Sequence, residues 1–103
     1  MKQFNLAISL ITLCLASTVN AKCVQNNNTV TFTGLDDANG TIYASLRDSN
    51  NKCNCTEVRF KPEYTNTEMA LSILLTAKIS KTKVRVDFLE ENSCNTAYRI
   101  YLE

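Results

Sequence analysis

The sequence predicts a mainly β domain, a small five-stranded barrel with one helix, in the order β-β-β-α-β-β. Five short segments alternate apolar and polar residues, as half-buried strands do. One apolar segment between the third and fourth strands has the length and spacing of a helix. Four of the five cysteines stand just before or at the starts of the first, third and fifth strands, where two disulfides can tie the barrel together.

The first 21 residues have the three-part pattern of a cleaved secretory signal peptide. Lys2 precedes an apolar run from Leu6 to Leu15, and the segment ends in small residues at Ala21. We expect cleavage after Ala21, which leaves residues 22–103 as one domain. No later run reaches the ~20 apolar residues that a membrane-spanning helix needs. We therefore expect a secreted protein, in the periplasm or outside the cell, without membrane insertion.

The first two strands are expected over residues 29–35 and 41–47, joined by a turn in which Gly40 is available for a positive φ. In the first strand the residues that alternate with threonines are Val30, Phe32 and Gly34. In the second strand the apolar set is Ile42, Ala44 and Leu46. Tyr43 and Arg47 then lie on the opposite face of the second strand.

The third strand is expected over residues 55–60 and is ended by Pro62, which cannot donate to a strand ladder. The last two strands are expected over 83–89 and 97–102. Across these three strands the inward residues are Val58, Phe60, Val84, Val86, Phe88, Tyr98, Ile100 and Leu102.

The helix is expected within "TNTEMALSILLTAKIS", residues 65–80, where Thr65 and Glu68 have the spacing of a capping box. At ~100° per residue, apolar side chains cover roughly two-thirds of its circumference. A helix that covers a small barrel buries about half a circumference or less. We therefore expect the surplus to form an oligomer interface; the alternative is a helix buried deeply under loops. The candidate interface residues are Met69, Leu71, Ile73 and Leu75.

A single helix between the third and fourth strands is the connectivity of the OB-fold barrel; an open sheet with the helix packed on it is the alternative. In the barrel, the starts of strands one, three and five gather at one end, which brings four cysteines together. A bridge between Cys53 and Cys55 would be strained if that segment is extended. We expect Cys23 to pair with Cys53 and Cys55 with Cys94, while the exchanged pairing stays open.

Catalysis is not expected. The chain has no histidine to act as a general base, and the cysteines are used in bridges. The acidic pairs Asp36–Asp37 and Glu90–Glu91 fall in turns, where solvated side chains are the simpler interpretation. Without histidine or C-x-x-C spacing a zinc site is disfavoured as well, so we expect no metal and no cofactor.

The charge balance argues against a general nucleic-acid binder. One of the 11 basic residues, Lys2, lies in the leader, which leaves ten against ten acidic residues; nucleic-acid binding needs a basic surplus. The run Lys78, Lys81, Lys83 and Arg85 has a single-strand-binding interpretation, since OB barrels often bind single strands. We interpret it instead as a helix end followed by the solvent face of a strand, and expect no nucleic-acid partner.

The C-terminal half resembles the B subunits of bacterial AB5 toxins, the pertussis-like and subtilase-cytotoxin-like group. "EMALSILLTAKISKTKVRVDF" is similar to the helix, short turn and V-x-V strand of that group, and "NSCNTAYRIYLE" to its late cysteine and closing strand. The first half matches at "GTIYASL". The resemblance implies a ring, usually a pentamer, whose helices line a central pore and whose outer surface binds host glycans, often sialylated. Such a ring can carry a catalytic A subunit.

The resemblance also implies a glycan site with a small hydroxyl residue just ahead of a tyrosine in the second strand. Thr41 and Tyr43 take those positions here. From the strand pattern we add Arg47 and Arg59, outward donors beside Tyr43 that can hold a sugar carboxylate. The competing hypothesis is a stand-alone secreted protein, such as a monomeric enzyme inhibitor, on the same barrel.

Overall fold

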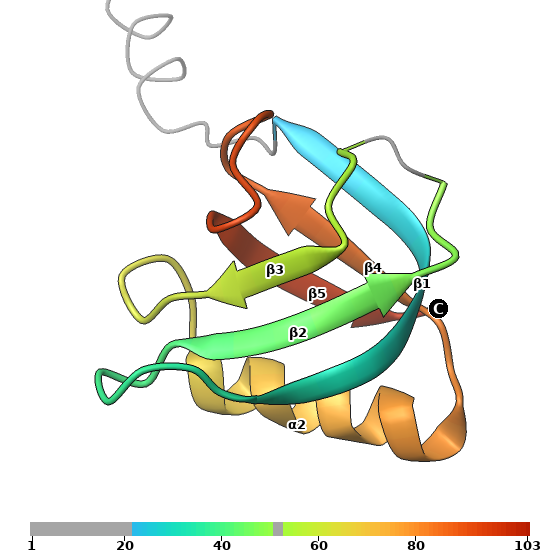
Figure 1. Ribbon diagram of the computed structural model, residues 1–103, viewed down its shortest axis with the longest axis horizontal. Helices are drawn as coiled ribbons and strands as arrows, with labels where there is room; N and C mark the ends of the chain where they lie inside the picture. Colours follow the sequence, from blue (N-terminus) through green and yellow to red (C-terminus); the bar gives the residue numbers. More distant parts are fainter. Residues whose placement is uncertain (1–21, 51–52) are drawn as a thin grey trace, which may run out of the picture.

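The computed structural model describes residues 22–50 and 53–103 (Figure 1). The predicted signal peptide, residues 1–21, lies outside the described residues. Within the described ranges no helix has both the length and the apolar character that crossing a bilayer requires.

Over the described ranges, five strands and one helix follow one another in the predicted order. Their bounds are β1 Cys23–Leu35, β2 Ile42–Arg47, β3 Glu57–Phe60, α2 Thr67–Ser80, β4 Val84–Phe88 and β5 Ala97–Leu102. The first strand is longer than predicted because its two halves have different partners. Its N-terminal half pairs with β4 and its C-terminal half with β2.

The strands close into one barrel in the order β1-β2-β3-β5-β4 (Figure 1). All neighbours are antiparallel except β3 and β5, which meet in parallel at Phe60 and Ala97. Closure depends on the length of β1, which pairs with β4 from Cys23 onward and with β2 as far as Leu35. The sheet is thus closed, and α2 runs along one side of it, beneath the C-terminal half of β1 (Figure 1).

The strand pattern of β1 is corrected at one point. The register with β2 shifts between Val30 and Phe32, so Thr31 is an extra residue in the ladder. An extra residue breaks the alternation of faces. As a result Val30 is buried while Phe32, predicted to share its face, is 68% exposed.

A second correction concerns β5. Its ladder with β4 is irregular beside Phe88, so Ala97 rather than Tyr98 lies opposite Phe88 and is fully buried. Ile100 is buried as predicted, whereas Leu102 at the strand end is 47% exposed.

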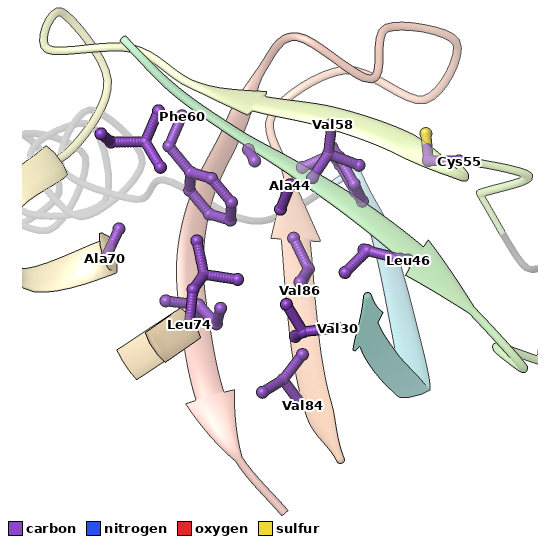
Figure 2. Packing of buried hydrophobic residues seen from close by; sticks show 14 of the residues in the cluster. Val30, Ala44, Leu46, Cys55, Val58, Phe60, Ala70, Leu74, Val84 and Val86 are labelled. Atoms are coloured by element: carbon purple, nitrogen blue, oxygen red, sulfur yellow. The ribbon is translucent and has the colours of Figure 1, made fainter. Parts of the chain in front are cut away.

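The core fills the barrel interior and is completed by α2. The largest fully buried apolar side chains are Phe60, Phe88, Leu46 and Leu74. Leu74 enters from the helix, and Figure 2 shows it beside the inward valines of the strands. Ala70 and Ala77 are also buried on the same helix face, and their small side chains let the helix approach the sheet closely.

The helix begins one residue later than the predicted capping box. Asn66, not Thr65, is the N-cap, and its side chain accepts the Met69 N–H at 3.1 Å. Asparagine is among the best N-cap residues, so it satisfies the same orphan donors that Thr65 was expected to serve. At the other end, Lys81 adopts the left-handed conformation with φ 59° and ends the helix.

Two disulfides tie the strand starts together. Cys23 is bonded to Cys53, with Cα atoms 5.8 Å apart, and Cys55 to Cys94, at 5.6 Å. This is the first of the two pairings that the sequence left open. Two bridges in so short a chain indicate a non-reducing environment.

Candidate functional site

Three of the four predicted glycan residues meet on the outer face of β2 and β3. Tyr43 lies directly across the ladder from Arg59. The guanidinium of Arg59 stands over the Tyr43 ring, 5.5 Å from its centroid. The Tyr43 hydroxyl donates to Oε1 of Glu57 at 2.7 Å, and Nη2 of Arg47 lies 4.0 Å from Oε2 of the same carboxylate.

Arg59 is held in place by groups outside its own strand. Its Nε donates to Oδ2 of Asp36 at 2.8 Å, and Nη1 donates to Oδ1 of Asn95 at 3.4 Å. The hydrogen bond to Asp36 is the main cause that raises the pKa of Arg59 above its ordinary value. The turn after β1 and the loop before β5 therefore fix a guanidinium on the outer surface.

Thr41 does not join this group. It is buried, and its hydroxyl donates to Oδ1 of Asn39 at 2.8 Å, while its N–H donates to the same oxygen at 3.0 Å. Both donors are thus used to form the turn between β1 and β2, in which Gly40 has φ 101°. The structure places Thr41 as a turn residue, whereas Tyr43, Arg47 and Arg59 lie together.

The chemistry of the outer cluster differs from a simple carboxylate clamp. Its two guanidiniums face two carboxylates, those of Asp36 and Glu57, so the charges balance. A sugar carboxylate placed beside Tyr43 would approach Glu57, which is unfavourable. Carboxylate oxygens, guanidinium N–H groups and an aromatic ring together suit the hydroxyls and apolar face of a neutral sugar better.

A second surface is the outward face of α2. Met69 is 62% exposed, Leu75 42% and Ile79 81%. The other two predicted interface residues, Leu71 and Ile73, are half-buried and pack against the core. The predicted surplus of apolar side chains is therefore present, on the side of the helix opposite Leu74.

Two hydroxyl groups on this helix face donate hydrogen bonds to carbonyl oxygens of the same helix. The Thr76 hydroxyl donates to the Ser72 carbonyl oxygen at 2.9 Å, and the Ser80 hydroxyl donates to the Thr76 carbonyl oxygen at 2.7 Å. These donors bond to the helix's own backbone, as Ser and Thr do inside helices. The outward face thus combines apolar groups with the hydroxyls of Thr76 and Ser80, which bond to the helix backbone, and it also carries the exposed carboxylate of Glu68.

A third cluster lies on β4 and β5. The carboxylate of Asp87 is fully buried and accepts from Arg85 at 2.8 and 3.1 Å and from Arg99 at 3.1 Å. Each guanidinium also stands over a tyrosine ring, Arg85 over Tyr101 at 5.3 Å and Arg99 over Tyr98 at 5.0 Å. These contacts fix the positions of the two arginine side chains on the outer face of β4 and β5.

These surfaces are the features of the chain from which a function can be inferred. No protein-family model, curated protein or solved structure matches it. In the part of the chain that the structure describes, no group of three or more histidine, cysteine, aspartate or glutamate residues is placed to hold a metal ion.

Three residues of these surfaces were not predicted from the sequence. Glu57 could have been found, because the alternation of the third strand already put it on the face of Arg59. Asp36 was interpreted as a solvated turn residue, and the pairing of β1 and β3 on either side of β2 brings it to Arg59. Ile79 lies four residues after Leu75 and so on the same helix face, but it was not among the predicted interface residues.

Proposed function

We propose that this chain is a secreted protein similar to the B subunits of AB5 toxins. It is an OB-fold barrel that assembles into a ring, a pentamer, and binds cell-surface glycans of a host. The ring then serves to deliver a catalytic A subunit. The barrel order with its single helix and the two disulfides support the OB-fold and export.

The observation that carries the proposal is the exposed apolar face of α2. Met69, Leu75 and Ile79 lie in solvent on a helix whose opposite side is buried in its own barrel. Exposed apolar groups that gather on one face mark interaction surfaces. In a ring, one side of each helix can stay in its barrel while the other side meets a neighbouring copy.

Magnitudes indicate that the helix does not act alone. Burial of one large apolar side chain contributes about 1.5–3 kcal/mol, and association costs about 4–15 kcal/mol. Three partly exposed side chains are therefore marginal. Three further large apolar side chains are exposed on the same chain, Phe32, Leu35 and Leu102, and assembly would have to bury such groups in addition to the helix face.

The glycan part of the proposal is supported by the outer cluster of Tyr43, Glu57, Arg59 and Asp36. An aromatic ring beside fixed charged groups can contact the apolar face of a sugar and bond its hydroxyls. Arg47, 48% exposed in its side chain, stands beside the cluster as a further donor.

The second candidate is a stand-alone monomeric inhibitor. It is favoured by Phe32 and Leu35, which are 68% and 69% exposed on β1 next to a tight turn. Protruding apolar side chains of this kind fill pockets on partner proteins.

A glycan array separates the two candidates. The wild-type protein should bind a defined set of neutral glycans, and Tyr43→Ala should lose that binding. Tyr101→Ala is the matched control, because Tyr101 is also an outward tyrosine under an arginine but lies on β5. Equal binding by Tyr43→Ala and wild type would remove the outer cluster from the sugar site, and a protein that binds no glycan would favour the inhibitor.

A further inference from the structure

A cavity of about 440 Å³ lies between β1 and the C-terminal end of α2. Residues 29–31 line it from the strand, and Ala77, Lys78, Lys81 and Thr82 line it from the helix end. Its volume lies within the ~300–1,000 Å³ of small-molecule sites. It is separate in its residues from the outer cluster around Tyr43.

Two local irregularities form this cavity. Thr31 is the extra residue of the β1 bulge and therefore lies outside the regular ladder. Lys81, in the left-handed conformation, turns the chain back at the end of α2. Val30 and Ala77 lie at its base but are only 5% and 1% exposed, so the apolar groups that a ligand can reach belong to the lysine and threonine side chains of the lining.

The threonine hydroxyls of the wall are arranged as acceptors. Thr31 Oγ1 donates to the Ser45 carbonyl oxygen at 3.1 Å, and Thr29 Oγ1 donates to Oδ2 of Asp48 at 2.9 Å. A hydroxyl has one proton and two lone pairs. Because the protons are used, the oxygens can accept from a ligand; Thr29 already accepts once, from Lys83 Nζ at 2.6 Å.

The rim carries the positive charge. Lys78 and Lys81 are exposed, one helical turn apart, and neither forms an ion pair with any residue of the ranges 22–50 and 53–103. The carboxylate of Asp48, which bonds Thr29, is itself offset by Lys83 at 3.6 Å. A helix C-terminus carries about half a negative charge, so two lysines leave a positive surplus at the opening.

We infer that this cavity binds a sugar residue that carries one anionic group, a carboxylate or a sulfate. The lysine ammonium groups bind the anion, the threonine oxygens accept from the sugar hydroxyls, and the methylene and methyl groups of the same side chains contact the apolar face of the ring. The choice of a sugar over other small anions rests on the proposed glycan-binding function. The charge-balanced cluster at Tyr43 then takes a neutral sugar, and the cavity takes an acidic one.

Amide NMR titration of the whole mature chain tests this inference with four probes: glucuronic acid, galactose 6-sulfate, galactose and inorganic sulfate. Both acidic sugars, or one of them, should shift the amides of residues 29–31 and Thr82, and galactose should not at the same concentration. Lys78→Ala and Lys81→Ala should each weaken this binding about tenfold, because each removes a charge-assisted hydrogen bond. Lys61→Ala, which removes the same charge outside the cavity, should leave it unchanged.

The outcomes are distinct. Unshifted cavity amides, or equal affinity in the two lysine variants and wild type, would overturn the inference. Inorganic sulfate bound as tightly as galactose 6-sulfate would overturn the sugar and leave an anion site. Glycan binding that depends on Tyr43 but not on the lysines would overturn the cavity site and leave the proposed glycan-binding function standing. Acidic sugars that shift the cavity amides, together with no binding on the glycan array, would overturn the proposed function and leave the cavity site standing.

Discussion

The hydroxyl of Tyr43 donates a 2.7 Å hydrogen bond to Oε1 of Glu57 across the β2–β3 ladder. This bond joins the tyrosine that the sequence singled out to a carboxylate that it did not. It also orients the ring under the Arg59 guanidinium. The pair is therefore the fixed centre of the outer cluster.

The first prediction concerns the titration of this pair. The hydrogen bond to Glu57 is the main cause that raises the pKa of Tyr43 above its ordinary value of 10.0. The native state thus holds the phenolic proton more tightly, so the bond stabilises the fold below pH 10.0 and is lost as pH rises through the raised pKa. Glu57→Gln should lower the pKa of Tyr43, which NMR of the ring carbons can follow. A pKa unchanged in Glu57→Gln would show that the bond does not exist in solution.

A second prediction concerns the buried carboxylate of Asp87. Asp87→Asn leaves two guanidiniums facing one amide oxygen, and we expect the free energy of unfolding to fall by about 2 kcal/mol. Asp48→Asn is the control, since that carboxylate is 64% exposed and surface pairs contribute about 1 kcal/mol or less. Urea unfolding measures both. Equal losses in the two variants would contradict the role assigned to Asp87.

A third prediction concerns a buried polar pair in β1. Gln25 and Asn28 are fully buried, and the Gln25 side chain donates to the Cys55 carbonyl oxygen at 2.8 Å and accepts the Cys55 N–H at 3.0 Å. Gln25→Leu leaves that backbone without partners, so we expect a loss of about 2 kcal/mol or more. Thr33→Val, which removes a half-buried hydroxyl from the same strand, should cost less. Thermal unfolding compares them, and a Gln25→Leu variant as stable as wild type would refute the prediction.

A fourth prediction concerns the disulfides. Removal of either bridge by paired Cys→Ser substitution should lower the free energy of unfolding by about 2–5 kcal/mol, the range typical of small disulfide-bonded domains. The bridges span 39 and 30 residues, and loop entropy depends only on the logarithm of that length. The two losses should therefore be similar. A loss confined to one bridge would show that local packing, not chain entropy, decides its contribution.

The strands and the helix could be predicted because each depends on a local pattern, whereas the cysteine pairing stayed open between two alternatives. Alternation places Val58 and Phe60 inward whatever the rest of the chain does. The strand order then brings the cysteines to one end of the barrel. These features need no knowledge of side-chain geometry.

The remaining features depend on contacts between distant segments. The bulge at Thr31 turns Phe32 outward, and the regular alternation of residues around Thr31 does not predict an extra residue in the strand. Asp36 meets Arg59 only because β1 and β3 flank β2 in the closed sheet. Asp87 alternates as an outward residue, yet β1 on one side and Arg99 on the other cover it completely.

The exposure of the α2 side chains determines which variants can test the ring. Leu71 and Ile73 pack partly against the core, so an aspartate at either position would disturb folding as well as assembly. Leu75 and Ile79 reach further into solvent and carry no such ambiguity. Asn92→Asp adds one of the two negative charges of the double variant, on an exposed loop away from the helix, and serves as the control for added charge.

Light scattering coupled to size-exclusion chromatography at micromolar concentration measures whether the chain assembles into a ring through α2. The wild-type chain and Asn92→Asp should elute with the mass of a closed ring. The double variant Leu75→Asp, Ile79→Asp should elute as a folded monomer with an unchanged circular dichroism spectrum. A wild-type monomer, or a double variant that keeps the mass of the wild-type ring, would contradict assembly through α2.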